Sequence, residues 1–119
     1  MKLDINGKSL EFAFGMGFLG ELLDETGLGL DEVLQKVDKN PYKFIPICMY
    51  VSTKYAYEIK GKQIDFDRFT FIEWLEADGG LTDKNKSAIK FMKAFTDSLF
   101  KNVPDEENEK GKTDDAKKK

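Results

Sequence analysis

The chain has 119 residues, of which 40% are hydrophobic and 13% aromatic, and this length and composition predict one packed domain rather than a disordered chain. Its 19 basic and 22 acidic residues give a net charge of −3 and form no basic stripe, which argues against nucleic acid as a partner. Histidine is absent, so the commonest general base and the commonest metal ligand are both missing, which argues against an enzyme.

The N-terminal residues predict a β-hairpin. Apolar residues alternate with polar ones in 2–5 and again in 8–14. Between them, Asn6-Gly7 is a pair that a two-residue type I′ turn prefers, because both of its central residues adopt positive φ. An isolated hairpin is only marginally stable in water, so we expect its apolar face to pack against the rest of the chain.

After residue 15, apolar residues recur at helical spacing, and turn or capping residues divide them into about five helices. The expected helices run from Met16 to a stop at Gly27, from Asp31 to near Asn40, from Tyr42 to Ile59, from a cap at Asp65 or Asp67 through Phe69 and Leu75 to Asp78-Gly79-Gly80, and from near Thr82-Asp83 onward. The expected fold class is mainly α (α+β), with an N-terminal β-hairpin packed on a compact bundle of about five helices.

The central helix and the last helix carry more specific expectations. Asn40-Pro41 is a good N-cap and first-turn pair, but Pro46 lies about a turn and a half further on. We therefore expect the central helix to start or bend between Pro41 and Pro46. The last helix is amphipathic. Its expected apolar side consists of Ile89, Met92, Phe95 and Leu99.

Residues 104–119 differ from the others in composition. They contain no apolar side chain large enough to anchor a core, and acids and lysines fill most positions. Such a segment cannot bury enough apolar surface to fold, so we expect a disordered, charged C-terminal tail. The preceding residues, 1–103, are expected to form a single domain.

The segment 14–20 reads FGMGFLG and contains G-x-G-x-x-G, the spacing of a dinucleotide-binding loop. Such a loop follows a buried parallel strand and precedes a helix and a second parallel strand. Here the preceding strand is half polar and belongs to a hairpin, so we interpret the glycines structurally and expect no cofactor. Gly15 and Gly17 would release the chain into the helix, and Gly20 would permit a neighbouring element to approach closely.

The remaining reactive side chains favour structural roles. Cys48 is the only cysteine and lies among apolar residues without a histidine partner, so we expect an inert buried thiol. With no signal peptide and no membrane-spanning run, the chain fits a reducing cytoplasm and no membrane. The acidic pairs Asp65 with Asp67 and Glu73 with Glu76 fit helix caps and solvated faces better than a metal site or acid–base chemistry.

Aromatic residues exceed the needs of one core in two places. Three tyrosines gather towards the end of the central helix, and the aromatic residues and Ile72 within 69–74 cannot all face inward from one short helix. They fit either the rim of a core or a protein-binding surface, since aromatic side chains provide contact area at little entropic cost. The candidate protein-binding residues are Tyr50, Tyr55, Tyr57, Phe69, Phe71 and Trp74.

The order of these parts resembles a known family. The hairpin LDINGKSLEFAFG, the segment MGFLGELLDETGLGLDEVLQKV and a helix opening at NPYKF are similar to the tail assembly chaperones of long-tailed bacteriophages that infect Gram-positive hosts. Members of that family begin with a strand, NGK, a second strand and a phenylalanine-glycine-x-glycine-phenylalanine-leucine segment, matched here by 14–19. The resemblance covers roughly the first 60 residues, and none of its motifs is catalytic.

The resemblance implies a non-enzymatic protein of the host cell cytoplasm. Such a chaperone binds the long, helical tape measure protein, keeps it soluble, promotes polymerisation of the tail tube and leaves before the virion matures. It also implies self-association and a longer, frameshifted form that recruits the major tail protein. Lys110-Gly111-Lys112 and the three lysines 117–119 are peptides that slippery codons would encode. The alternative is a small structural tail or connector subunit that is retained in the phage particle.

Overall fold

The computed structural model, which describes residues 1–81 and 86–102, begins with a two-stranded antiparallel hairpin of β1 (Lys2–Ile5) and β2 (Lys8–Glu11). Asn6 and Gly7 have φ angles of 52° and 78°, so the predicted turn chemistry is confirmed. The second strand ends three residues before Phe14, because the chain leaves the ladder after Phe12 donates a last hydrogen bond, 2.7 Å long, to Met1.

The hairpin is followed by five helices: α1 (Met16–Thr26), α2 (Leu30–Lys39), α3 (Pro41–Glu58), α4 (Arg68–Ala77) and α5 (Lys86–Asn102). The predicted fold class, a hairpin on five helices, is therefore confirmed. Gly27 ends α1 in the left-handed conformation, with φ of 70°, and its N–H donates to the Leu23 carbonyl. Of the two possible caps of α4, Asp67 is the one used, since its carboxylate accepts a 2.8 Å hydrogen bond from the Thr70 N–H.

The central helix α3 starts at Pro41 and continues through Pro46 without interruption. Pro46 removes the hydrogen bond that the Tyr42 carbonyl would otherwise accept, and Tyr42 is an exposed residue of the first turn. Asn40 precedes the helix as expected, although its side chain makes no capping hydrogen bond. The helix therefore starts at Pro41, the first residue of the range in which a start or bend was expected.

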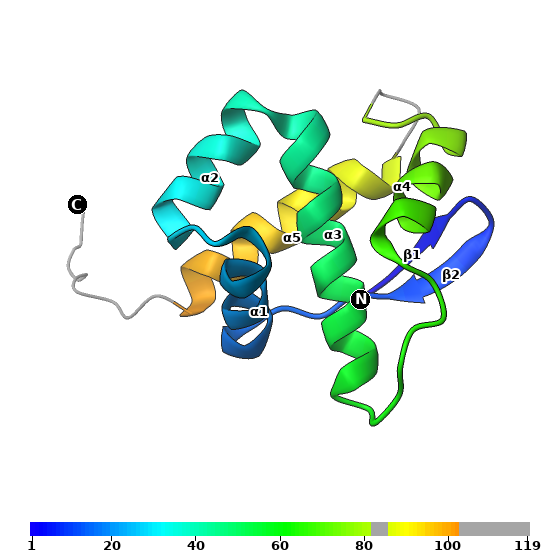
Figure 1. Cartoon of the computed structure of the whole chain (residues 1–119), viewed down its shortest axis with the longest axis horizontal. Coiled ribbons are helices and arrows are strands. Elements are labelled where there is room, and N and C mark those ends of the chain that lie inside the picture. The colour runs from blue at the N-terminus through cyan, green and yellow to red at the C-terminus, as the bar shows by residue number, and fades with distance from the viewer. Residues whose placement is uncertain (82–85, 103–119) are drawn as a thin grey trace.

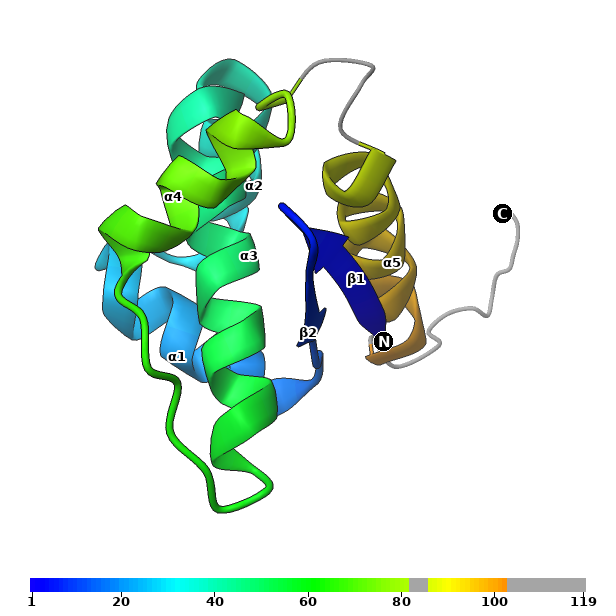
Figure 2. The same ribbon diagram turned by 90° about the vertical axis from the view of Figure 1, so that its right-hand side faces the viewer.

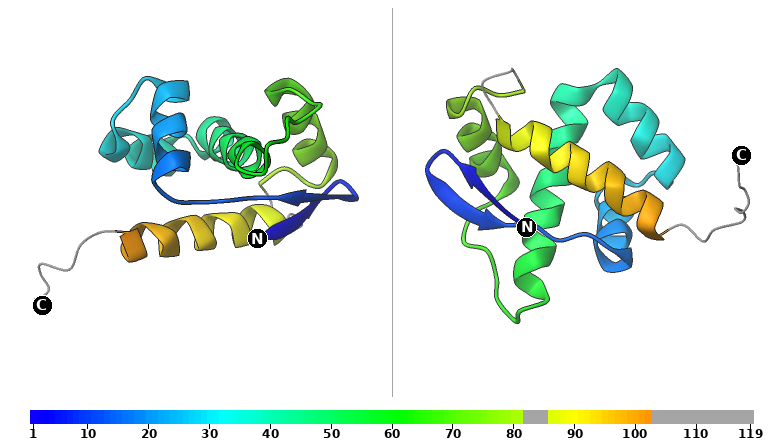
Figure 3. Two further views of the ribbon diagram at one scale, coloured as in Figure 1. Left: turned by 90° about the horizontal axis from the view of Figure 1, so that it is seen from below. Right: turned by 180° about the vertical axis from the view of Figure 1, so that it is seen from behind.

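The elements form three layers, with the hairpin in the middle. Figure 2 and the left view of Figure 3 show α5 alone on one side of the hairpin and α1 to α4 on the other. The central helix α3 contacts each of the other four helices and also β2 (Figure 1). None of the helices within residues 1–81 and 86–102 combines the length and the apolar character needed to cross a bilayer.

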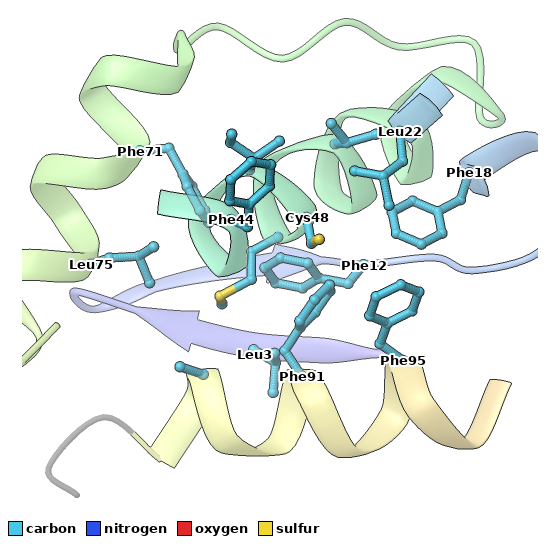
Figure 4. Close-up of a cluster of buried hydrophobic side chains, with 14 of the residues drawn as sticks. Leu3, Phe12, Phe18, Leu22, Phe44, Cys48, Phe71, Leu75, Phe91 and Phe95 are labelled. Carbon is cyan, nitrogen blue, oxygen red and sulfur yellow. The ribbon is translucent and has the colours of Figure 1, made fainter. Parts of the chain in front are cut away.

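Aromatic rings from distant parts of the chain meet between these layers (Figure 4). Phe12 lies edge-on to Phe91 of α5 at 5.6 Å between ring centroids, and Phe18 of α1 lies edge-on to Phe95 at 5.4 Å. Phe14 bridges them, with centroids 5.6 Å from Phe18 and 5.4 Å from Phe91. Such pairs add about 0.5–1.5 kcal/mol each beyond the burial of their area.

The buried face of α5 differs from the expected one. Ala88, Phe91 and Phe95 are buried, whereas Ile89 is 54% exposed. Met92 and Leu99 pack at the margin of the core. The sequence pattern was ambiguous because α5 carries apolar residues around more than half of its circumference, and the tertiary contact with Phe12 and Phe14 selects the Phe91 side. The predicted start at 82–83 and the predicted tail at 104–119 lie outside the described residues.

One buried hydroxyl ties the end of the hairpin to α3. Ser52 is fully buried, and its Oγ donates a 2.8 Å hydrogen bond to the Ala13 carbonyl while accepting a 3.1 Å hydrogen bond from the Ala13 N–H. Its neighbour Thr53 is equally buried, but its Oγ1 has no hydrogen-bond partner among the described residues. Two adjacent hydroxyls thus have opposite energetic roles.

We expect Ser52→Ala to lower the free energy of unfolding by about 1–3 kcal/mol, because it leaves the partly buried N–H and C=O groups of Ala13 without their side-chain partner. Thr53→Val keeps the shape and removes an unsatisfied buried hydroxyl, so it should be neutral or stabilising by about 1 kcal/mol. Urea unfolding of both variants measures the difference. Equal losses in the two variants would contradict this assignment.

Candidate protein-binding surface

Helix α4 distributes its large side chains around its whole circumference. Phe71 and Leu75 face the core and are buried, Ile72 and Trp74 are half-buried on opposite flanks, and Phe69 is 71% exposed. The expectation that these residues cannot all face inward is met. Phe71 itself belongs to the core, so it is withdrawn from the candidate contact residues, whereas Phe69 is available to a partner.

One flank of α4 forms a groove with the hairpin, which we call the hairpin groove. It has a volume of about 590 Å³ and is lined by Lys8, Leu10, Tyr57, Lys62, Gln63, Ile64, Asp65, Phe66, Thr70 and Trp74. Lys8 Nζ lies 4.6 Å from the centroid of the Trp74 ring, and the Phe66 and Trp74 rings are 4.9 Å apart. Two of the candidate contact residues, Tyr57 and Trp74, therefore meet here although 17 positions separate them in the sequence.

The opposite flank of α4 forms a second groove with the first turns of α3, which we call the α3–α4 groove. Its volume is about 220 Å³, and it is lined by Tyr42, Pro46, Ile72, Leu75, Glu76, Gly79, Gly80 and Leu81. Tyr42 is 77% exposed at its rim. Phe69 lies one helical turn before Ile72 and extends this apolar surface along α4.

Sequence reasoning missed Tyr42. A signal was present, because Asn40-Pro41 predicted a helix start and a residue in a first turn has few helical neighbours to cover it. Recognising the α3–α4 groove itself required knowing that the start of α3 lies beside the end of α4, which no local pattern contains.

The other two tyrosines of the candidate set serve packing. Tyr50 is half-buried, with its ring centroid 6.1 Å from that of Phe71, and burial raises the pKa of its phenol. Tyr55 is also half-buried and lies across Gly17 of α1. The six predicted residues thus separate into one exposed residue, two that line a groove, two at the core margin and one in the core.

The glycine segment turns the chain and permits a close approach, but the close approach occurs at a different glycine from the one expected. Gly15 has a φ of 121°, which L side chains rarely adopt, and it turns the chain from the hairpin into α1. The close approach occurs at Gly17, where an added Cβ would lie 2.6 Å from Cζ of Tyr55. Gly20 has nothing within 4 Å of such a Cβ, so the predicted close approach at Gly20 is wrong.

An acidic cleft of about 260 Å³ lies between α1 and α3. Its lining includes Glu21, Asp24, Glu25, Lys54 and Glu58. Lys54 Nζ is 3.6 Å from Glu58, and Glu25 makes a 2.8 Å ion pair with the guanidinium of Arg68. Burial, and secondarily the neighbouring Glu58 carboxylate, raises the pKa of Glu21.

Cys48 and the acids Asp67, Glu73 and Glu76 lie where structural roles place them. Burial raises the pKa of Cys48 to about 12, so its thiolate is not populated at neutral pH. The Thr70 N–H lowers the pKa of Asp67, as a capping role requires, and Glu73 and Glu76 are exposed on α4. Within residues 1–81 and 86–102, no group of three or more Cys, Asp or Glu side chains is placed to hold a metal ion.

Comparisons of this chain with models of known protein families, with curated proteins and with solved structures found no match.

We expect Gly20→Ala to raise the free energy of unfolding by roughly 0.5–1 kcal/mol, because alanine favours the helix and the new methyl group meets open space. Gly17→Ala should lack that gain, because its methyl group displaces the Tyr55 ring from α1. In a Tyr55→Ala background the two alanine variants should become equally stabilising. Thermal unfolding of the native protein, Tyr55→Ala and the alanine variants in both backgrounds, six proteins in all, tests this. A Gly17→Ala protein as stable as Gly20→Ala in the native background would contradict it.

We expect Glu21→Gln to stabilise the protein by about 0.5 kcal/mol at pH 7, or roughly 2–4 °C in Tm. Because the pKa of Glu21 is raised in the folded state, its ionisation destabilises the fold as pH rises from 4.5 through the folded pKa. The gain should therefore disappear at pH 4, where Glu21 is protonated. Glu73→Gln, at an exposed position of α4, is the control for removing a surface carboxylate and should change the free energy of unfolding at pH 7 by less than Glu21→Gln does.

Proposed function

We propose that this protein is a non-enzymatic tail assembly chaperone of a long-tailed bacteriophage, which binds the tape measure protein and keeps it soluble until the tail tube polymerises around it. The observation that carries the proposal is the exposed apolar surface of α4, formed by Phe69 and the adjoining α3–α4 groove. The chain also carries a hairpin and a glycine segment whose sequence resembles that family.

The physical basis is the complementarity of this surface to an amphipathic helix. A helix in solution that exposes an apolar stripe can lay that stripe into an apolar groove, with side chains at i, i+3, i+4 and i+7 as anchors. The α3–α4 groove is apolar along Pro46, Ile72 and Leu81, and Tyr42 stands exposed at its rim, with exposed Phe69 one helical turn before Ile72. A long helical partner can bind many copies, each weakly, so that the combined binding is strong.

The proposal includes the other properties that the resemblance implies. The protein would act in the host cell cytoplasm, associate with further copies of itself along the tape measure protein and be absent from the mature virion. A longer, frameshifted form would recruit the major tail protein, with the charged residues 104–119 as the linker. No cofactor, metal, nucleic acid or membrane takes part.

A pull-down of the tagged protein from phage-producing cells tests this, with elution at moderate salt and mass spectrometry of the eluate. The native protein should enrich a very long, helix-rich tail protein together with untagged copies of itself. Phe69→Ser should reduce that recovery roughly tenfold or more, because it removes an exposed aromatic anchor. Ile89→Ser is the matched control, since Ile89 is an exposed apolar residue of α5, remote from α4 in sequence, and should leave recovery unchanged.

Mass spectrometry of purified particles separates the chaperone from a structural tail or connector subunit. A chaperone should be nearly absent from mature particles, while a structural subunit would be present in stoichiometric amounts. Abundant peptides in particles, or a pull-down that contains only the bait and tail-tube proteins, would replace the chaperone proposal with the structural one.

A further inference from the structure

The two strands of the hairpin direct alternate backbone groups away from each other. Phe12 donates its hydrogen bond to Met1, and antiparallel pairs alternate between bonded and non-bonded, so Leu3 with Leu10 is the next bonded pair. The N–H and C=O groups of Ser9 and Glu11 therefore point away from β1, along the outer edge of β2.

The two edges of the hairpin have different surroundings. The edge of β1 is covered by α5, where Ser87 Oγ donates a 2.7 Å hydrogen bond to the Asp4 carbonyl. Helix α3 contacts β2, but the described part of the chain offers no hydrogen bond to the outward backbone groups of Ser9 and Glu11. A strand edge whose backbone groups are unpaired is a template for a further strand.

The free edge of β2 opens into two cavities. The hairpin groove contacts Lys8 and Leu10, and a second cavity of about 190 Å³ contacts Ser9 and Glu11. The second cavity is lined by Lys2, Ser9, Glu11, Tyr57, Lys60 and Lys62. Tyr57 and Lys62 line both cavities. Taken together, the cavities are lined by all four residues of β2, so there is space for a segment beside the strand.

The charges around this space favour an acidic occupant. Four lysines line the two cavities, against two carboxylates, Glu11 and Asp65. Glu11 is already engaged by the N-terminal ammonium at 3.2 Å and by Lys60 at 3.8 Å. The hydrogen bond from the N-terminal ammonium is the main cause that lowers the pKa of Glu11. This carboxylate therefore stays ionised with its charge already paired, and the lysine charge dominates around the space.

We propose that the edge of β2 binds an extended, acidic segment of a partner protein, which adds a third strand to the sheet. Its backbone hydrogen-bonds Ser9 and Glu11, its acidic side chains lie near Lys8 and Lys62, and one apolar side chain enters the hairpin groove against Trp74. This site is separate from the helix-binding surface at Phe69, and it stands whether or not the protein is a tail assembly chaperone.

The test uses two capped octapeptides in which valine and threonine alternate, one with two glutamates at each end and one with two lysines. Titration into the full-length ¹⁵N-labelled protein, followed by NMR, should show the acidic peptide shifting the amide resonances of Ser9 and Glu11 and the indole resonance of Trp74. The acidic peptide should bind at least about tenfold more tightly than the basic one.

Ser9→Pro removes an outward N–H of the edge, and it should abolish binding of the acidic peptide. Ser9→Ala keeps the N–H and should bind as the native protein does. Lys62→Glu changes an exposed residue outside the strand and should weaken binding of the acidic peptide at least about tenfold. This variant tests the proposal even if Ser9→Pro disturbs the hairpin.

Three outcomes would overturn the proposal. The first is equal binding of the acidic and basic peptides. The second is unchanged binding of the acidic peptide to Lys62→Glu and to a folded Ser9→Pro protein. The third is dimerisation of the free protein that Ser9→Pro abolishes in sedimentation measurements, because a second copy of the chain would then occupy the edge.

Discussion

The architecture depends on how four residues, 12–15, leave the hairpin. Phe12 is buried against α5, Ala13 is held on α3 by both its backbone groups through Ser52, and Phe14 joins α1 to α5. Gly15 then turns the chain into α1 with a backbone conformation that other residues rarely adopt. Because these contacts connect the hairpin to three helices, the position of each surface feature follows from them.

Fixing the hairpin on α3 also determines what α4 can expose. Its core side is occupied by Phe71 and Leu75, and one flank faces the hairpin through Trp74, Lys8 and Phe66. The other flank faces the start of α3 and leaves the apolar α3–α4 groove open. A helix of ten residues thereby separates two surfaces of different character, one apolar and one rich in lysine and aromatic side chains.

These two surfaces suit different partner conformations. The α3–α4 groove offers side-chain contacts without directed hydrogen bonds, which suits a helix that has satisfied its own backbone. The edge of β2 offers backbone donors and acceptors, which suit an extended segment. A protein of this size with both could hold one partner by its helical and extended parts together, or two partners at once, since the surfaces lie on opposite flanks of α4.

The sequence by itself determined the elements whose cause is local. Asn6-Gly7 specifies a tight turn, Gly27 ends a helix and an aspartate at 65 or 67 begins one, because each acts on backbone groups within a few residues. The buried state of Cys48 and the excess of aromatic residues on α4 followed from composition and period. In the glycine segment, the expected turn out of the hairpin occurs at Gly15, whose backbone has a φ of 121°.

Only the tertiary structure decided the features that depend on which distant element lies opposite. Phe91 rather than Ile89 faces the core because Phe12 and Phe14 meet α5 there, and Gly17 rather than Gly20 is crowded because Tyr55 crosses α1 at that point. The two grooves likewise combine residues from elements far apart in the chain. Periodicity fixes the spacing of side chains along one helix, but the direction of the helix face is set by packing energy against partners that the local sequence does not contain.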